Sequence, residues 1–293
     1  MWNRRMVAGL WAIYSRCYDG LLDLAPYREL LDDTVKAAEP EVARTVVDLG
    51  CGTGNVIDRM LGWSLGPDTR FIGVDSSEEM LRVADRKVGS DHRVELTRSD
   101  INSWLRAQAT ASIDRITSVN ALYTFDDAER RTFWEECRRV LTPAGRAVIV
   151  TTDREGFWPV VREQYERAGS VRRGLTGRLV LIAVMNSVIW LFESRDLFHP
   201  VPHEQLKAES RAAGFGVIES WRSYGGCDDG VAVTVVIEPV VVVGDAERSV
   251  CGGGGDERRE SVPVVAASDV SDAVTGPRSA TGSVHHVEHD PRS

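Results

Sequence analysis

Three glycines within five residues follow a short apolar segment near residue 50. Glycines at this spacing allow the backbone to come close to a ligand. The segment reads Val46-Val47-Asp48-Leu49 and continues as Gly50-Cys51-Gly52-Thr53-Gly54. Glycine allows a sharp turn and a close approach of backbone to a bound molecule. A helix that begins after such a loop offers free N–H groups to an anionic group or a carboxylate. The spacing therefore predicts a binding loop between a buried strand and a helix.

Acidic residues follow the next two apolar segments of the chain. Asp75 ends segment 70–75, 21 residues after the last glycine, and Asp100 follows segment 93–97. An acid at the first position can accept hydrogen bonds from ribose hydroxyls. A carboxylate at the second can accept from an exocyclic adenine amine. Each acid alone is as well explained as a helix cap or a turn residue. Together with Asp48, they favour a nucleotide-type site along one sheet edge.

A regular alternation of strands and helices must position these residues. β-branched and apolar runs predict five strands, with helices between them, at 45–49, 70–75, 93–97, 113–119 and 146–152. This alternation of strands and helices is typical of an α/β, Rossmann-like doubly wound and mostly parallel sheet. Strands at 215–224 and 231–239 are predicted to add a C-terminal antiparallel hairpin, which completes a seven-stranded sheet.

Changes in pattern along the chain predict five segments. Residues 157–168 and 176–193 read as two helices that interrupt the alternation, the second of them apolar almost all round. From residue 244 the sequence is rich in Gly, Ser and Asp without periodicity. We expect a helical N-terminal cap at 1–40, a ligand-binding core at 41–155, a helical substrate lid at 156–200, a C-terminal helix and hairpin of the core at 201–243, and a disordered tail at 244–293.

The composition of the chain disfavours some binding partners and indicates the cellular compartment. The net charge is −9 and the isoelectric point about 5.3, which disfavours nucleic acid as the main partner. Five scattered cysteines, none in C-x-x-C spacing, are typical of reduced thiols in a cytoplasmic protein. The longest apolar stretch, 179–192, is too short for a transmembrane segment. No metal site is expected, since the histidines near residue 286 read as part of a solvated tail.

From about residue 40 to 240, the chain resembles class I S-adenosylmethionine-dependent methyltransferases, in particular the small-molecule and quinone-biosynthesis branch. Four motifs in the family's order carry the resemblance: the glycine loop at 48–54, the segment 71–81, the adenine-side segment 98–101 and the turn 141–146. The N-terminal segment 14–22 is similar to the entry segment of that branch. The resemblance implies S-adenosylmethionine as the cofactor.

Carried over residue by residue, the resemblance implies a cofactor site built on the sheet edge. The glycines Gly50, Gly52 and Gly54 would pack against the methionine part, with Asp48 below it. Asp75 would hold the ribose hydroxyls. The remaining predicted contacts are Ser76 and Met80 beside the adenosine, Asp100 and Ile101 at the adenine, Asn120 near the sulfonium, and Tyr18, or alternatively Tyr14, over the methionine carboxylate.

The molecule that would accept the methyl group is less well defined by the sequence. Tyr123, His199 and His203 are candidates for a general base, and each is also well explained as a structural or surface residue. The D/N-P-P-Y motif of enzymes that methylate amide or base nitrogens is absent after the fourth strand. The aromatic and aliphatic residues of segment 156–200 would suit an apolar acceptor, although the same face would also suit packing on the sheet or a homodimer.

The sequence thus predicts methyl transfer to a small, lipophilic acceptor, at an oxygen, nitrogen or carbon atom that it does not specify. One alternative is a protein of this fold recruited to a non-methylating reaction, such as a cyclisation, or to regulation, because a fold does not fix a function. A nicotinamide-dependent oxidoreductase is disfavoured, since the glycines are spaced G-x-G-x-G rather than G-x-G-x-x-G.

Overall fold

The computed structural model describes residues 9, 11, 13–63, 68–153, 199–223 and 232–241, together with the backbone of 265–266. The predicted lid lies outside these residues except for its last two positions. The predicted tail lies outside them except for the backbone of Val265–Ala266. The segment boundaries given above therefore stay predictions. No helix within the described ranges is long and apolar enough to cross a membrane.

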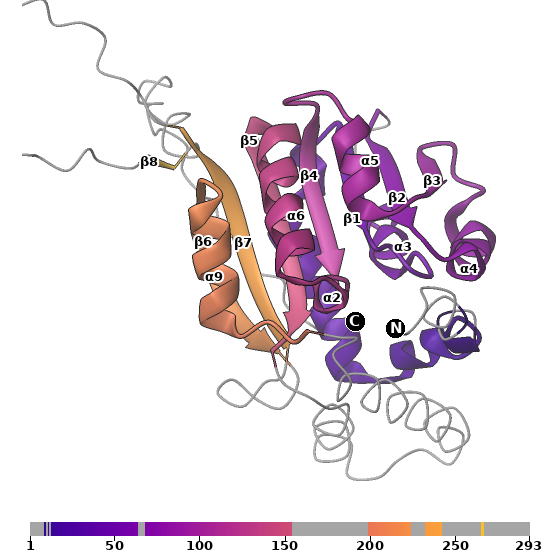
Figure 1. Ribbon diagram of the computed structural model, residues 1–293. Helices are drawn as coiled ribbons and strands as arrows, with labels where there is room; N and C mark the ends of the chain where they lie inside the picture. Colours follow the sequence, from indigo (N-terminus) through magenta and orange to yellow (C-terminus); the bar gives the residue numbers. More distant parts are fainter. Residues whose placement is uncertain are drawn as a thin grey trace, which may run out of the picture.

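A twisted sheet with the strand order β3-β2-β1-β4-β5-β7-β6 forms the centre of the molecule (Figure 1). Strands β1 to β5 are parallel to one another, whereas β7 runs antiparallel to both β5 and β6. The predicted doubly wound sheet with its antiparallel hairpin is confirmed. The strands are β1 (Thr45–Leu49), β2 (Arg70–Asp75), β3 (Val94–Arg98), β4 (Ile113–Val119), β5 (Leu141–Thr152), β6 (Phe215–Ser223), β7 (Ala232–Val241) and β8 (Val265–Ala266), a short strand that pairs with β7.

Helices cover both faces of this sheet. One face carries α2 (Ala25–Ala38) and α3 (Asn55–Leu61), with α4 (Glu78–Val88) beyond them. The other face carries α5 (Ile101–Ala107), α6 (Asp127–Val140) and α9 (His203–Ala212). Short 3-10 helices connect these elements: η1 (Tyr18–Asp23), η2 (Pro40–Val42) and η3 (Leu122–Thr124).

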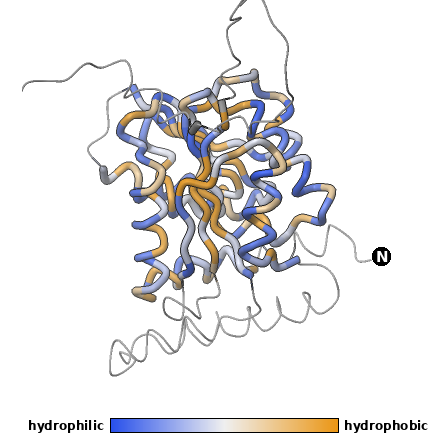
Figure 2. The backbone as a smooth tube through the Cα atoms, turned by 90° about the vertical axis from the view of Figure 1, so that its left-hand side faces the viewer, coloured by the Kyte–Doolittle hydropathy of each residue, from blue (hydrophilic) through white to orange (hydrophobic). Residues whose placement is uncertain are grey.

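Two apolar cores result from the alternation of side chains along the strands. In β1, Val47 and Leu49 pack under α5 and α6, whereas Val46 packs under α2 and α3. Figure 2 shows the hydrophobic strands at the centre with more hydrophilic helices around them. The strict alternation puts Asp48 on the same face as Val46, toward α2 and α3.

Most predicted elements lie within one or two residues of their observed positions. Strand β5 is the clearest difference, because it begins at Leu141 rather than Arg146 and includes the predicted turn Thr142–Gly145. The pairing of β4 with β5 shifts register between Ile113 and Arg115, so the extra residues are absorbed as an irregularity in the ladder. Gly214, with a φ of 85°, ends α9 as its sequence position predicts.

The order of the strands predicts where a ligand binds. The chain winds from β1 toward β2 and β3 on one side, and toward β4 and β5 on the other. In open sheets of this kind, ligands bind in a crevice at the carboxyl ends of the strands where the winding reverses, which in this strand order is the end of β1 between β2 and β4. In Figure 1 the indigo N-terminal segment lies below the arrowhead of β4, at this edge.

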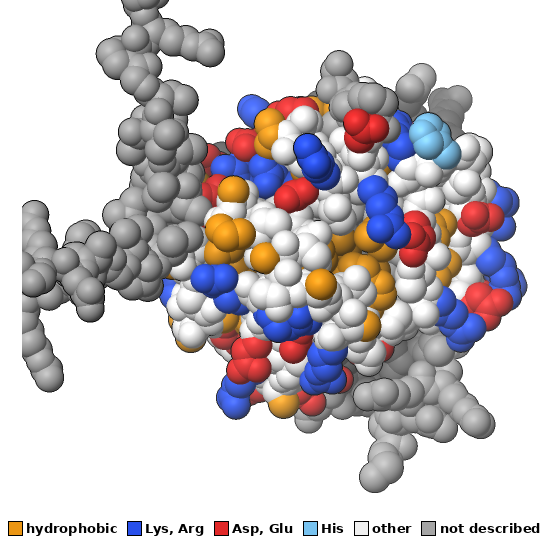
Figure 3. Space-filling view, turned by 90° about the horizontal axis from the view of Figure 1, so that it is seen from above, with side chains coloured by type: hydrophobic (Ala, Val, Ile, Leu, Met, Phe, Trp, Pro, Cys, Tyr) orange, Lys and Arg blue, Asp and Glu red, His pale blue; other side chains and the backbone are white. Residues whose placement is uncertain are grey.

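The opposite edge of the sheet has a different surface. Figure 3, seen from above, shows acidic and basic side chains interspersed around a limited hydrophobic patch. Charges of one sign do not form a continuous field on the part of this face that the structure describes. That face therefore offers no uniform field to steer a highly charged partner.

Candidate active site

The glycine loop turns at the carboxyl end of β1 and is tied to β2. The backbone N–H groups of Gly50 and Cys51 both donate to the carbonyl of Val74, at 2.8 and 3.0 Å. Gly50, Gly52 and Gly54 all have positive φ, between 53° and 77°, which L side chains rarely adopt. The sequence therefore requires glycine at these three positions for backbone reasons alone.

The three glycines differ in what surrounds them. A Cβ on Gly50 would lie 2.6 Å from Cβ of Ala121, and one on Gly54 would lie 3.2 Å from Cβ of Ala84. A Cβ on Gly52 would meet no atom within 4 Å. Gly50 and Gly54 are thus needed for internal packing, whereas Gly52 faces open space in which a ligand can approach the backbone.

Asp75 joins the glycine loop to the end of β2. One carboxylate oxygen accepts a hydrogen bond from the Gly52 N–H at 2.9 Å, and the other accepts from the Ser77 N–H at 2.8 Å. Burial raises the pKa of Asp75, and the backbone donors oppose this rise. Each carboxylate oxygen has two lone pairs, so both still have capacity to accept from a ligand's hydroxyl groups.

Asp48 lies beneath the loop and is almost fully buried. Its Oδ1 accepts a hydrogen bond from the Thr117 hydroxyl at 2.8 Å, while Oδ2 is buried without a partner. Burial, together with the nearby charge of Asp75, raises the pKa of Asp48 to about 7, although the Thr117 bond lowers it. An unpartnered acidic oxygen at this edge suits a cationic group of a ligand.

This raised pKa leads to a first prediction, on stability. Asp48 titrates near 3.9 when unfolded, so unfolding is favoured progressively as pH rises from about 4 to 7. In Asp48→Asn, the amide oxygen can still accept from Thr117, but this titration is absent. We expect the variant's free energy of unfolding, relative to wild type, to increase between pH 4 and 8 by up to about 4 kcal/mol.

Urea unfolding of both proteins without cofactor, at a series of pH values, measures this difference. Other titrating groups are common to both proteins and cancel. Parallel pH profiles for wild type and variant would contradict the raised pKa of Asp48.

Asn120 ends β4 next to the end of β1. Its N–H donates to the carbonyl of Val150 at 2.8 Å, its φ is 55°, and its side-chain Oδ1 is buried without a partner. The predicted position of Asn120 at this edge is therefore observed. Its orphaned oxygen, like Asp48 Oδ2, favours an electron-poor group in the crevice.

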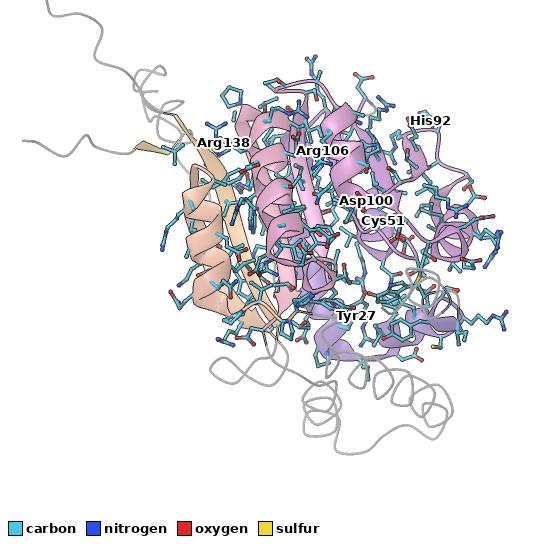
Figure 4. The ribbon with its side chains drawn as sticks, viewed as in Figure 1. Tyr27, Cys51, His92, Asp100, Arg106 and Arg138 are labelled. Carbon is cyan, nitrogen blue, oxygen red and sulfur yellow. The ribbon has the colours of Figure 1, made fainter. Side chains whose placement is uncertain are left out.

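Tyrosines of the N-terminal segment gather over the same edge. Tyr18 lies edge-on to both Tyr14 and Tyr27, with ring centroids 5.2 and 6.4 Å apart. Burial raises the pKa of Tyr18 well above its usual value, and neighbouring tyrosines, Tyr123 among them, reinforce this rise. In Figure 4, Tyr27 lies below the carboxyl ends of the strands, with Cys51 above it. These phenols are neutral and present an aromatic wall.

A polar latch, which the sequence does not reveal, fastens this segment to the glycine loop. Asp19 Oδ1 accepts from the Thr53 hydroxyl at 2.6 Å, and Asp19 Oδ2 pairs with the Lys87 ammonium at 3.0 Å. Lys87 also donates to Asn55 Oδ1. The latch, which consists of Asp19, Thr53, Asn55 and Lys87, connects η1, the loop, α3 and α4. Its only signal in the sequence is that Lys87 is one of three lysines in an arginine-rich chain.

The other predicted cofactor residues lie after β2 and β3 and at the starts of α4 and α5. Asp100 caps α5 by accepting from the Ser103 N–H at 3.0 Å, so the capping role considered for it is present. Figure 4 shows Asp100 nearer the carboxyl edge than Arg106 of the same helix. Ile101 is buried next to Gly50, and Met80 is buried at the start of α4. Ser76 is exposed beside Asp75, and its N–H contributes to holding that carboxylate.

The three candidates for a general base occupy different positions. The N–H of His199 donates to the carbonyl of Tyr123 at 2.6 Å, so the two lie together at the end of β4. His203 begins α9, and its Nε2 is buried without a partner. Tyr123 is buried near Tyr18. A catalytic role for any of them stays a prediction.

The doubly wound sheet and the polar groups at the carboxyl end of β1 fit an enzyme that binds an adenosyl cofactor. Residues 46–145 match the family described as the methyltransferase domain. Over these residues the chain is similar to class I S-adenosylmethionine-dependent methyltransferases, and the match supports methyl transfer from that cofactor to a small molecule.

Two curated relatives lie in the small-molecule branch. Demethylmenaquinone methyltransferase of Lactococcus lactis is 28% identical over 66% of this chain and 74% of that protein. Trans-aconitate 2-methyltransferase of Azoarcus sp. is 31% identical over 57% of this chain and 64% of that protein. This chain therefore spans slightly less than two thirds of the second relative.

A solved structure supports the fold. The N-methyltransferase NodS from Bradyrhizobium japonicum, in complex with S-adenosyl-L-homocysteine, superimposes with a TM-score of 0.51 and 14% sequence identity. The match covers 75% of this chain and 90% of that one. At this identity the likeness concerns the architecture alone.

The residues at the crevice fit S-adenosylmethionine. Open space beside Gly52 leaves room for close contact, and the unpartnered oxygens of Asp48 and Asn120 suit the cofactor's cationic groups. Asp75 has the residual acceptor capacity that ribose hydroxyls require. When bound, the cofactor supplies an electrophilic methyl group on a positively charged sulfur.

The latch leads to a second prediction, on cofactor affinity. In Asp19→Ala the N-terminal segment loses both its bond to Thr53 and its ion pair with Lys87. Because the pair is partly exposed, we expect a loss of about 1 kcal/mol, or about fivefold in affinity for S-adenosylhomocysteine. The control is Asp32→Ala, which removes the Asp32–Arg59 ion pair between α2 and α3.

Calorimetric titration of both variants measures the difference. The Asp32 variant should bind as wild type does. Equal affinities for the two variants would show that the latch does not contribute to the cofactor site.

Proposed function

We propose that the acceptor is a small and largely apolar molecule that binds against the tyrosines at the carboxyl edge. The observation that carries the proposal is the cluster of Tyr14, Tyr18 and Tyr27, which is buried or half-buried, with Tyr123 close to Tyr18. Neutral aromatic rings give a large apolar contact area at low entropic cost. The resemblance to a relative named for demethylmenaquinone supports the same class of acceptor.

The cofactor site is proposed to consist of the residues predicted from the sequence, extended by the latch. Asp75 holds the ribose and Asp48 balances the positive charge. The glycine loop contacts the methionine part, and Asn120 lies close to the reacting sulfur. The tyrosine segment excludes water, and proximity and alignment then supply much of the rate enhancement, on the order of 7–11 kcal/mol in well-oriented systems.

The test is methyl transfer from labelled S-adenosylmethionine to a panel of acceptors. The panel contains alkyl-substituted hydroquinones and phenols, together with polar tricarboxylates as the contrasting class. We expect label in the apolar acceptors, with a product mass higher by one methylene unit. Label only in the tricarboxylates would overturn the apolar assignment, and conversion without a mass gain would indicate a non-methylating reaction.

A homodimer and a cytoplasmic location are proposals of the same kind. The thiols of Cys17, Cys51 and Cys137 are free and buried, in keeping with a reducing compartment. Sedimentation at several protein concentrations tests the dimer, and fractionation of the source cells tests the location.

A further inference from the structure

A second group of buried polar atoms lies at the same sheet edge, beyond Asn120 and on the side of β5. Asp153 directly follows β5, its side chain is only 4% exposed, and its Oδ2 pairs with Arg222 at 2.5 Å. Its Oδ1 is buried without a partner, as is Nε2 of His203. Buried polar atoms normally have partners, so two orphans at one edge indicate that a ligand completes them.

The backbone brings these residues together from three elements. The N–H of Val201 donates to the carbonyl of Thr152 at 3.0 Å, which places the start of α9 beside the end of β5. In the sheet, Thr152 and Ser223 are both paired with Ala232, so β5 and β6 end at the same level. Asp153, His203 and Arg222 therefore meet where β5 and β6 end.

Side-chain alternation places this cluster on the α9 face of the sheet. Trp221 packs on the opposite face with the α2 and α3 core, so its neighbour Arg222 points toward α9. The N–H of His199 donates to the carbonyl of Tyr123, which connects the segment before α9 to the end of β4. The cluster thus lies on the β5 side of β1, away from Asp75 and Asp100 at the ends of β2 and β3.

Resting on the proposed methyl transfer, we propose that Asp153 and His203 form the polar subsite of the acceptor. Oδ1 of Asp153 and Nε2 of His203 both face the hydrogen of a hydroxyl or N–H group of the acceptor and share its hydrogen bond. Nε2 of His203 takes that proton as the oxygen or nitrogen is methylated, so the proton ends on the imidazole. The new bond joins that atom to the methyl carbon, and the electron pair of the broken carbon–sulfur bond stays on sulfur.

The charges around His203 are compatible with this role. Burial lowers the pKa of His203, and the cations of Lys207 and Arg222 lower it further, while Glu204 and Asp153 oppose them. Lys207 is paired with Glu204 at 2.6 Å on the same helix. The imidazole is therefore neutral at pH 7 and able to accept a proton. Oδ2 of Asp153 is paired with Arg222, which fixes the carboxylate in place, so Asp153 orients the acceptor through Oδ1 while His203 takes the proton.

The subsite restricts the acceptor class. Because Oδ1 of Asp153 lacks a hydrogen bond, the subsite favours an acceptor that carries an O–H or N–H donor. An acceptor without that donor leaves the buried carboxylate oxygen without a partner. The acceptor is accordingly a phenol, an alcohol or an amine with an apolar body. A carbon nucleophile without an adjacent donor would gain nothing from these residues.

The first measurement uses a matched pair of probes, 4-butylphenol and its methyl ether 4-butylanisole, which differ in the donor O–H. Binding to the full chain saturated with S-adenosylhomocysteine is followed by calorimetry. We expect wild type to prefer the phenol at least tenfold and Asp153→Asn to lose this preference. The control Glu219→Gln removes a negative charge from β6 on the face opposite Arg222 and should keep it.

The second measurement separates a catalytic histidine from a structural one. Methylation of 4-butylphenol by His203→Gln should be slower in kcat by about 10²-fold or more, with KM nearly unchanged. In wild type, kcat should fall at low pH as His203 becomes protonated, and this limb should be absent in the variant. Thermal unfolding of each variant shows whether the fold is intact.

Each outcome decides the inference. Equal binding of the two probes to wild type, or the same preference in Asp153→Asn, overturns the subsite. Binding of the phenol without its methylation by wild type overturns the role of His203. Failure of the cofactor itself to bind would instead contradict the proposed function, so the two failures are distinguishable.

Discussion

Replacing Asp75 by Ala is expected to weaken the binding of S-adenosylmethionine at least tenfold, which corresponds to about 1.4 kcal/mol. Two effects add in this variant. The carboxylate that would accept from the ribose hydroxyls is removed, and the N–H groups of Gly52 and Ser77 lose the acceptor that holds them. The second effect means that the loop itself becomes less ordered before the cofactor arrives.

Calorimetric titration of S-adenosylmethionine into wild type and Asp75→Ala measures the loss. The matched control is Glu79→Ala, which removes an acid of the same charge from the first turn of α4, where the side chain is 41% exposed. The control should bind as wild type does. Retention of full affinity by a folded Asp75→Ala variant would refute the assignment of Asp75 to the ribose.

The second large effect is expected at the glycine loop, where Gly50→Ala and Gly52→Ala should fail in different ways. In Gly50→Ala the new Cβ lies 2.6 Å from Cβ of Ala121, in a backbone conformation with a φ of 76°. Left-handed strain costs roughly 1–2 kcal/mol and overpacking roughly 1–3 kcal/mol. We therefore expect Gly50→Ala to lose about 2–5 kcal/mol of stability, with or without cofactor.

In Gly52→Ala only the strain applies, because nothing lies within 4 Å of the new Cβ. Its stability should fall by roughly 1–2 kcal/mol. Its affinity for S-adenosylmethionine should fall much further than in a loop variant whose new side chain does not enter this space. The reason is that the alanine side chain occupies the open space beside the backbone, where the cofactor is expected. Urea unfolding and calorimetry on both variants distinguish these two results.

The packing of the loop would be contradicted if Gly50→Ala kept its stability or if Gly52→Ala kept its cofactor affinity. A stable Gly50→Ala protein would show that Ala121 can move away at little cost. Normal cofactor affinity in Gly52→Ala would show that the cofactor does not use the open side of Gly52.

The sequence by itself determined the sheet and led to the residues proposed for the cofactor site. Strand alternation, the glycine spacing and the acids at strand ends are local signals, because β-branched runs, turns and caps depend on neighbouring residues. The family's resemblance pointed to the same residues, and the structure places Asp48, Asp75 and Asn120 at one edge. The start of β5 was wrong, since Leu141 already pairs with Ile113 of β4, and Pro143 and Gly145 lie in the unpaired irregularity between that pair and the one at Arg146.

Only the tertiary structure brought together residues from distant elements. The latch joins Asp19 to Thr53 and Lys87, which are 34 and 68 residues away in the sequence. The proposed acceptor subsite joins Asp153 to His203 and Arg222, which are 50 and 69 residues away in the sequence. No local pattern specifies such contacts, because they depend on strand order, register and the level at which each strand ends. The raised pKa of Asp48 likewise follows from burial, which is a property of the packed sheet and not of its sequence motif.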